Sequence, residues 1–438
     1  MGEDIVALTI TTPTGKSLPL KLWLDFSMNR SITRLVNTAR VSVIWDFPVN
    51  WGLFVGSTAT ISIFPKNRSV HFETLMTGYI TNIERVYTSE KERVILTIKD
   101  KTVDLEQCTP VTEQVPGFDD TSKITPSSFG EGIYLQEIVN ALCKPFGISV
   151  MDQSFRQGSF DNTTISIQET VWSQIQKLCT QTAVTAYTDT QSRLVIDNFL
   201  YTHRTREQGP YKDVDSYAIG VSRKKRGPRY DPFARTVTST AHRDILTIDH
   251  TNTLQVTQTT GFDKRFSDYI VINSDGEALG EEFGPEEASE AGTVISSAKD
   301  TYIKRHRPIT VQASDSKFQG DINQFPDWLK QINRGDSVGF TAELDEWYQM
   351  VQRDGRQVIQ LFTSGQVVSV NLPKWDYKGK FVISGADFSL NDSKRSLSVS
   401  LVPLDLFLPM PQEEKSVQYQ WVYEGDPDRE IEKMKGGE

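Results

Sequence analysis

A β-hairpin pattern that occurs twice in the chain constrains the fold most. Residues 78–108 alternate apolar and polar side chains on both sides of the polar turn TSEKER, and residues 380–409 do the same around the turn NDSKR. The apolar series are Val94, Leu96 and Ile98 in the first hairpin and Leu397, Val399 and Leu401 in the second. Alternation with a period of two is typical of a strand that buries one face. Each hairpin then reaches an Asp-Leu pair, so the two segments match in pattern and in order.

The similarity continues upstream of both hairpins. An alternating stretch at 41–45 is followed by VGSTATISIF around Gly56, and one at 338–344 is followed by SGQVVSVNL around Gly365. We therefore predict a diverged internal repeat, with copies about 300 residues apart. The alternative is that two unrelated amphipathic hairpins look alike by chance.

The rest of the N-terminal segment, residues 1–108, also alternates in short stretches separated by turn residues. The apolar positions are Val6, Leu8 and Ile10; Leu20, Leu22, Leu24 and Phe26; Val41, Val43 and Trp45; and Ile61 and Ile63. Short strands at this spacing favour a sandwich or barrel. We predict two tube-like β-barrel domains, at 1–108 and 330–409, in a mainly β chain with α+β insertions.

Between residues 109 and 199 the period changes, which predicts a small α+β domain. One apolar helical stripe consists of Leu135, Ile138, Val139, Leu142, Cys143 and Phe146, and Gly147 is placed to end that helix. A second helix is expected over 169–181, with SIQE at 166–169 spaced as a capping box. A hairpin should follow, built from AVTAY, the turn TDTQSR, and the alternating pair Leu194 and Ile196.

Residues 200–329 are expected to form a polar linker and a further β-rich segment. The basic run at 223–226 is predicted to be a solvated face or an ion-pair partner rather than a phosphate site. Alternation returns between 235 and 273, and the acidic, glycine-containing stretch 274–292 is predicted to be a mobile loop.

Bulk properties exclude several classes of protein. A net charge of −10 over 438 residues argues against a dedicated nucleic-acid binder, which normally carries a basic face. The three cysteines (Cys108, Cys143 and Cys179) show no CxxC spacing, so neither a disulfide framework nor a zinc site is predicted. The N-terminus lacks a secretory pattern, and no apolar run approaches the roughly 20 residues that span a bilayer. Assembly in a reducing cytosol, without a membrane anchor, is expected.

Catalytic motifs are missing from the sequence. None of the five histidines lies in HExxH or beside a glycine-framed serine, and no phosphate-binding loop occurs. His306 is predicted to belong to a basic structural patch. Two acidic groups, Glu281 with Glu282 and Glu343 with Asp345 and Glu346, could supply a glycosidase pair, but solvated surface charge is the stronger interpretation. We therefore predict a non-enzyme without cofactor or metal.

Three stretches together resemble the baseplate hub proteins of contractile-tailed phages, in particular the Mu-like tail hub family. They are the N-terminal hairpin with LTIKDKT at 96–102, WSQIQKLC at 172–179 followed by LVIDNF, and KDTYIKRHRP at 299–308. The type VI secretion spike and the hubs of related contractile injection systems share that architecture more distantly. The resemblance covers residues 1–409. It is interrupted by the acidic stretch 274–292 and by residues 345–362.

The resemblance implies a structural role. A hub of this family is a homotrimer whose two tube-like barrels per chain form a ring of six, joining the six-fold tail tube to the three-fold spike. Its expected partners are the tail tube protein, the central spike, the tape-measure protein and other baseplate proteins. DNA would meet it only in passage, during ejection. The expected location is the virion tail baseplate, assembled in the host cytoplasm. The alternatives are a tail-associated cell-wall glycosidase, a carbohydrate-binding protein, or a tail-tube protein proper, for which one barrel would suffice.

The charged C-terminal tail, residues 410–438, contains the candidate contact residues Tyr419, Trp421 and Tyr423, which alternate among polar residues. Such a segment could add to a neighbouring subunit as a strand or anchor, or pack on its own domain. If the tail joins a neighbour, deleting residues 412–438 is expected to reduce the number of chains in the assembly, as measured by light scattering. An unchanged number of chains would eliminate this role for the tail.

Overall fold

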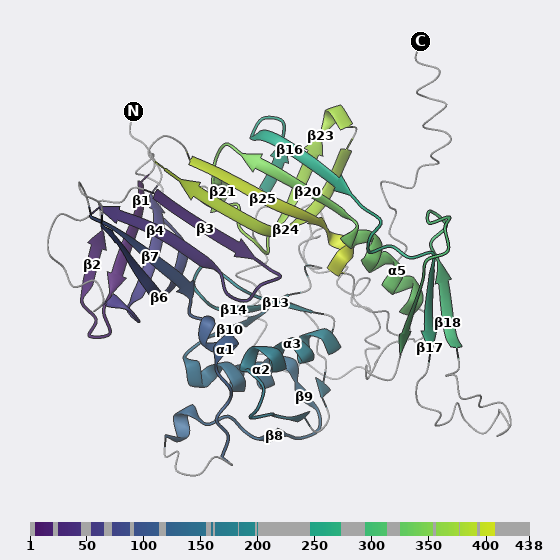
Figure 1. Cartoon of the computed structure of the whole chain (residues 1–438), viewed down its shortest axis with the longest axis horizontal. Coiled ribbons are helices and arrows are strands. Elements are labelled where there is room, and N and C mark those ends of the chain that lie inside the picture. The colour runs from purple at the N-terminus through teal and green to yellow at the C-terminus, as the bar shows by residue number, and fades with distance from the viewer. Residues whose placement is uncertain are drawn as a thin grey trace.

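The computed structural model describes most of the chain. The described residues are 5–20, 25–44, 54–64, 72–87, 92–113, 120–154, 159–160, 163–182, 184–197, 199, 246–272, 294–312, 325–353, 356–375, 377–391 and 395–407. Within these ranges, no helix has both the length and the apolar character needed to cross a membrane. The fold is mainly β, as predicted (Figure 1).

The N-terminal sheet is built from residues 5–100 and is entirely antiparallel. Its strands are β1 (Ile5–Thr11), β2 (Ser17–Leu20), β3 (Asp25–Ser31), β4 (Thr38–Ile44), β5 (Thr58–Phe64), β6 (Glu73–Tyr87) and β7 (Glu92–Asp100). They lie in the order β3-β4-β7-β6-β5-β1-β2. A short helix, α1 (Val103–Gln107), follows β7. The alternation in β7 is confirmed, because Val94, Leu96 and Ile98 are all fully buried.

The C-terminal sheet combines residues 338–403 with two strands that precede them in the chain. Its strands are β15 (Leu246–Asp249), β16 (Thr253–Thr260), β20 (Val338–Leu344), β23 (Val367–Leu372), β24 (Tyr377–Leu390) and β25 (Arg395–Pro403). They lie in the order β16-β20-β25-β24-β23-β15. Two 3₁₀ turns, η7 (Pro373–Trp375) and η8 (Leu404–Phe407), flank the final hairpin. The sequence alone had assigned β15 and β16 to the segment before this sheet.

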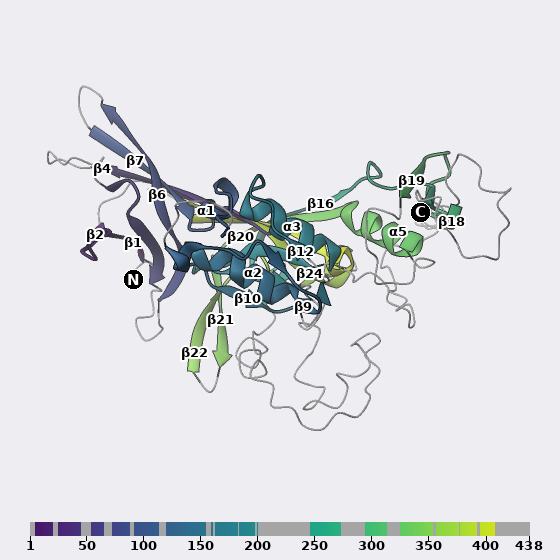
Figure 2. The ribbon, with the colours of Figure 1, turned by 90° about the horizontal axis from the view of Figure 1, so that it is seen from below.

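The stretch 345–362, where the family resemblance is interrupted, forms a separate hairpin. Its strands are β21 (Tyr348–Arg353) and β22 (Arg356–Leu361). Figure 2 shows this hairpin projecting away from the sheet. At its base Trp347 is fully buried and donates its indole N–H to the Ser396 carbonyl at 2.9 Å.

The two sheets have the same topology, as the predicted repeat requires. Strands β3, β4, β7, β6 and β5 correspond in order to β16, β20, β25, β24 and β23, and every pairing within these two sets is antiparallel. The outermost strands differ, since β1 runs antiparallel to β5 whereas β15 runs parallel to β23. Chance resemblance between two hairpins does not account for a common order of five strands.

Individual hydrogen bonds repeat as well. Gly56 and Gly365 have φ of 83° and 82°, in the left-handed region that favours glycine. The Gly56 N–H donates to the Ile80 carbonyl at 2.8 Å, and the Gly365 N–H donates to the Ile383 carbonyl at 2.9 Å. Directly after Ile80, β6 has a β-bulge in its ladder with β7, and directly after Ile383, β24 has one in its ladder with β25. These correspondences align the two copies residue by residue: Ile80 with Ile383, and Gly56 with Gly365.

The two sheets join edge to edge into one thirteen-stranded sheet. After its bulge, β24 pairs with β3 in an antiparallel ladder that runs from Gly385↔Ser31 to Leu390↔Phe26. One hydrophobic core extends across this junction, where the Phe26 and Trp347 rings lie 5.8 Å apart. The ladders among the described residues do not close either sheet into a barrel on its own.

The small α+β domain lies below the N-terminal sheet in Figure 1. Its elements are η2 (Thr121–Lys123), β8 (Ser128–Phe129), β9 (Ile133–Tyr134), α2 (Leu135–Cys143), η3 (Lys144–Phe146), β10 (Val150–Asp152), β11 (Ser159–Phe160), β12 (Thr163–Thr164), α3 (Val171–Gln181), β13 (Thr185–Thr188) and β14 (Leu194–Asp197). The predicted helical stripe, the stop at Gly147 and the β13–β14 hairpin are confirmed.

Two details of this domain bear on sequence predictions. The predicted capping box is wrong: the Ser166 hydroxyl accepts from the Gln168 N–H, and the Thr170 hydroxyl accepts from the Ser173 N–H at the start of α3. Cys143 and Cys179 are buried, and burial raises the pKa of each thiol to about 12.

A further three-stranded sheet lies beyond the C-terminal sheet. It consists of β17 (Asp268–Ile272), β18 (Val294–Lys299) and β19 (Pro308–Gln312), and α5 (Phe325–Asp336) packs against it (Figure 1). In the basic stretch before β19, the Arg305 guanidinium lies 4.4 Å from the Phe262 ring centre. Before β17, Arg265 pairs with buried Asp300 at 2.7 Å.

Buried polar groups fix the small domain to the N-terminal sheet. Arg30, only 1% exposed, donates from β3 to the carbonyls of Leu75 and Thr188, the latter at 2.8 Å. The Thr188 hydroxyl in turn donates to the Leu35 carbonyl at 2.7 Å. Because an unpaired buried polar group costs free energy, these bonds disfavour separation of the two domains.

An apolar cluster connects the small domain to both sheets. It contains Ile32 of the N-terminal sheet, Tyr187, Val195 and Phe199 of the small domain, and Val367, Val382 and Leu404 of the C-terminal sheet. Gly365 lies against this cluster, and a Cβ at Gly365 would lie 2.4 Å from the Tyr187 ring.

The equivalent glycines provide a matched pair of substitutions. Gly56→Ala adds a methyl group that meets no atom within 4 Å, so only backbone strain of about 1–2 kcal/mol is expected. Gly365→Ala adds the same strain and a clash with Tyr187, so its melting temperature should fall further. Equal losses in the two variants would show that the Tyr187 contact does not restrain the domains.

Asp100, at the end of β7, should make stability depend on pH. It is fully buried; its Oδ2 accepts from the Asn37 N–H at 3.1 Å, and its Oδ1 has no hydrogen-bond partner among the described residues. Burial raises the pKa of Asp100 to about 7, against opposing effects from Arg30 and Asn37. The folded state therefore holds a proton that the unfolded chain releases near pH 4.

Because the folded state binds the extra proton between these two values, the Asp100 contribution to stability should decrease as pH rises from about 4 to about 7. The expected slope is at most about 1.4 kcal/mol per pH unit. Asp100→Asn is expected to flatten this dependence, measured as the free energy or midpoint of unfolding across that range. The same slope in both proteins would refute the assignment to Asp100.

Candidate assembly interface

Among the described residues, the acidic side chains considered for chemistry do not assemble into a catalytic site. Glu346 forms an ion pair with Arg395, and Glu343 lies within the β20 ladder. Glu281 and Glu282 lie outside the described residues, as do the basic run 223–226 and the acidic stretch 274–292. Among the residues that the structure describes, no group of three or more His, Cys, Asp or Glu side chains could hold a metal ion.

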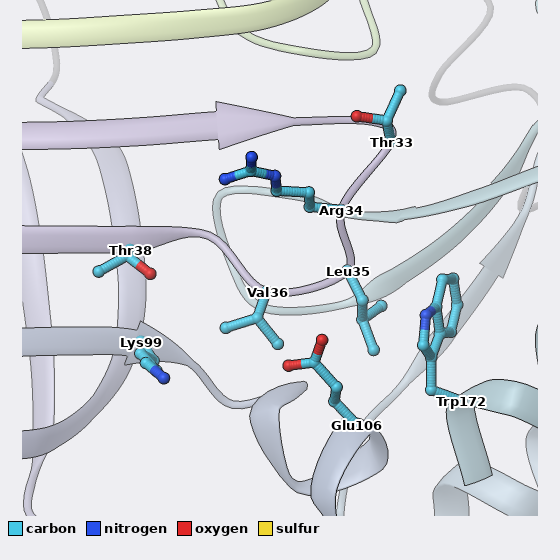
Figure 3. A pocket seen from close by; sticks show the side chains of 8 residues that line it. All are labelled: Thr33, Arg34, Leu35, Val36, Thr38, Lys99, Glu106 and Trp172. Carbon is cyan, nitrogen blue, oxygen red and sulfur yellow. The ribbon is translucent and has the colours of Figure 1, made fainter. Parts of the chain in front are cut away.

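A shallow pocket of about 250 Å³ lies between the N-terminal sheet and the small domain. Figure 3 shows Arg34, Lys99, Glu106 and Trp172 around it, from the β3–β4 connection, β7, α1 and α3. Arg34 and Glu106 are exposed, and the pocket contains a single carboxylate. This arrangement offers neither a pair of carboxylates nor a nucleophile with its base, so the pocket is a groove between two domains rather than a reaction centre.

Two unpaired strand edges of the joined sheet, on β16 and on the second half of β6, offer a different kind of site (Figure 1). Strand β16 ends the sheet order, and its outer side pairs with no described strand. Residues 82–87 of β6 extend beyond the ladder with β5, and no described strand pairs with them on the side away from β7. Tyr87 is 83% exposed in this extension. Unpaired edges of this kind are templates for pairing with another chain.

The outer edge of β16 has a defined hydrogen-bond phase. The Gly261 N–H donates to the Ser337 carbonyl at 2.8 Å, one position beyond the β16–β20 ladder. In an antiparallel pair, hydrogen-bonded positions alternate. Thr257 and Thr259 therefore direct their backbone groups toward β20, and Val256, Gln258 and Thr260 direct theirs to the outer side.

The composition of β16 leaves this edge unprotected. Its sequence, TLQVTQTT, contains no charge and no proline, the two features with which edge strands commonly block pairing. The alternation between residues 235 and 273 predicted a strand here, but sequence reasoning missed the lack of charge and proline along its edge. The predicted contact residues Tyr419, Trp421 and Tyr423 lie outside the described residues.

Comparison with known proteins identifies the small domain. Residues 119–198 match a family described as baseplate hub protein gp44-like, second domain. This range includes both helices and the β13–β14 hairpin, the part of the chain that joins the two sheets.

The similarity also extends along most of the chain. The baseplate hub protein gp44 of Escherichia phage Mu is 24% identical over 404 residues, which cover 90% of this chain and 88% of that protein. The 43 kDa tail protein of prophage MuSo2 from Shewanella oneidensis has the same fold, with a TM-score of 0.59, 18% identity, and coverage of 92% of this chain and 99% of that one.

A more distant likeness of fold reaches the PdpA–VgrG complex. One chain of its lidless form superposes with a TM-score of 0.51 and 9% identity, covering 95% of this chain and 67% of that chain. The predicted resemblance to the Mu-like tail hub family is therefore confirmed: the chain is a homologue of the Mu baseplate hub protein, with a gp44-like second domain at residues 119–198.

Proposed function

We propose that this protein is a structural baseplate hub of a contractile tail and that it acts as a homotrimer. Three chains, each with two equivalent sheets, would supply six similar positions in a ring. Such a ring joins the six-fold tail tube to the three-fold spike and leaves a channel through which DNA passes. The observation that carries the proposal is the common order of five strands in the two sheets, joined edge to edge in one chain.

Symmetry provides the physical reason why a hub would carry two equivalent sheets in each chain. A protein that must meet six-fold and three-fold partners needs six similar contacts on one side and three distinct ones on the other. A duplicated sheet provides the six, and features present once per chain provide the three. The β21–β22 hairpin and the β17–β19 sheet are such single features. The tail tube protein, central spike, tape-measure protein and other baseplate proteins are the partners that this role requires, within a virion tail assembled in the host cytoplasm.

The proposed role involves no catalysis. Its support is the description of the related Mu protein as a baseplate hub and the lack of a catalytic arrangement among the described residues. The alternative of a cell-wall glycosidase depends on carboxylates such as Glu343, which is exposed on β20. If the protein cleared peptidoglycan and Glu343→Gln abolished the clearing, that alternative would replace the structural role.

The trimer is directly testable. The purified full-length chain at micromolar concentration is expected to have a mass near three times 49.5 kDa by light scattering. Electron micrographs should show a ring with an open centre. A mass near that of one chain under these conditions contradicts the proposal.

A further inference from the structure

A patch of basic and aromatic side chains lies on the two stretches that lead into β17 and β19. Its members, which we call the basic–aromatic patch, are Phe262, Phe266, Lys304, Arg305 and Arg307. The Arg305 and Arg307 guanidinium groups lie 4.4 and 5.6 Å from the centre of the Phe262 ring, and Arg307 also lies 5.2 Å from that of Phe266. Phe262 nevertheless remains 48% exposed. Exposed guanidinium groups beside aromatic rings can bind both aromatic and acidic side chains.

The positive charge of this patch is only partly balanced by its surroundings. The three cations of the patch form no ion pair with a carboxylate among the described residues. Asp300 is already paired with Arg265 at 2.7 Å, and Asp336 of α5 is already paired with Lys264. Asp263, which is exposed, can offset one charge. A chain with a net charge of −10 therefore carries a local excess of positive charge here.

The described part of the chain ends close to this patch. Its last turn, η8, packs on α5, and Figure 1 shows this turn in yellow beside the helix. A Cβ at Gly335 of α5 would lie 3.1 Å from the Leu406 backbone nitrogen. The next residue of the helix, Asp336, pairs with Lys264, two positions after the first phenylalanine of the patch. Residues 408–438 therefore continue the chain from a point near the patch.

The C-terminal tail has a composition complementary to the patch. Residues 419–432 read YQWVYEGDPDREIE, with three aromatic side chains, then five carboxylates and one arginine. The 12-residue step from Phe407 to Tyr419 spans up to about 40 Å when extended, so the segment has ample reach. Nucleic acid is a poorer match, because the chain as a whole is acidic and the Asp263 carboxylate would repel its phosphates.

We propose that residues 419–432 dock on the basic–aromatic patch of their own chain. The aromatic side chains Tyr419, Trp421 and Tyr423 pack on the guanidinium groups and on Phe262, and the carboxylates that follow pair with the three cations. A tethered segment has an effective concentration in about the millimolar range, which favours the tail of the same chain over the tail of a free copy. This inference does not rest on the proposed hub role, because a contact within one chain is compatible with any number of chains.

Carbodiimide cross-linking of the full-length chain tests the contact, because it joins a carboxylate to an amine only where the two touch. Lys304 is expected to couple to carboxylates of residues 424–432, as identified by mass spectrometry after digestion. Lys16, also exposed but on the N-terminal sheet, is the control and should not couple to the tail. Lys304→Arg keeps the positive charge, removes the amine and should abolish the cross-link. Lack of any link from Lys304 to the tail in the wild-type chain would overturn the proposal.

Co-expression of two variants decides whose tail occupies the patch. One variant is full-length with Lys304→Arg, and the other retains Lys304 but lacks residues 412–438. A link between Lys304 and the tail can then form only between different chains. We expect none, because the tail docks on its own chain. A link in this mixture as strong as that in the wild-type protein would assign the patch to a neighbour's tail and overturn the proposal.

Trypsin cleavage after Arg429 measures docking independently. Where docking and release are fast, cleavage follows the population of the released tail. Arg305→Glu replaces attraction by repulsion, so it is expected to speed this cleavage about tenfold while the circular dichroism spectrum is retained. Arg34→Glu makes the same charge change at an exposed position outside the patch and should leave the rate unchanged. Equal rates in the two variants would overturn the docking.

A single-stranded oligonucleotide tests the competing assignment of the patch. Deleting residues 412–438 is expected to tighten its binding, since the docked carboxylates would no longer screen the three cations. Binding that is equally tight in the full-length and shortened chains, and that Arg305→Glu abolishes in both, would assign the patch to nucleic acid and overturn tail docking. A trimer without the Lys304 cross-link would likewise overturn docking but leave the hub role standing.

Discussion

The pairing of β3 with β24 is the interaction on which the rest of the structure depends. It converts two sheets that are far apart in the chain into one sheet with a continuous core. Antiparallel pairing satisfies the backbone groups of both edges, which would otherwise face solvent as adhesive strands. It also fixes the spacing of the two equivalent units, so any assembly built from this chain inherits that spacing.

The small domain stabilises this junction through contacts with both sheets. Arg30 bonds to it from β3, and the cluster around Tyr187 and Phe199 contacts both sheets. Polar bonds give this contact its geometry, because buried donors and acceptors tolerate little displacement. Apolar packing provides its stability, since it removes large side chains from water. The domain that matches the hub family is thus the one positioned to hold the two sheets at a fixed angle.

Duplication followed by divergence explains where the two halves differ. The bulge and the positive-φ glycine are retained in both copies, because they set the path of the backbone. The β21–β22 hairpin occurs in one copy and leaves the strand order unchanged. The hairpin lies between β20 and β23 in the chain, outside the five-strand order, so its insertion leaves the pairing of the repeated strands intact.

The sequence by itself determined the local elements and the repeat. Period-two alternation located β7 and β25, a helical stripe located α2, and turn residues located the hairpins, because each depends on neighbours in the chain. It did not determine that β15 and β16 join the C-terminal sheet, or that β3 pairs with β24 instead of closing a barrel. Those choices depend on contacts between residues hundreds of positions apart, and alternation shows only which face of a strand is buried. Which edge meets which strand was decided by the tertiary structure, where the packing of the small domain and the shared core select one pairing among several that the pattern allows.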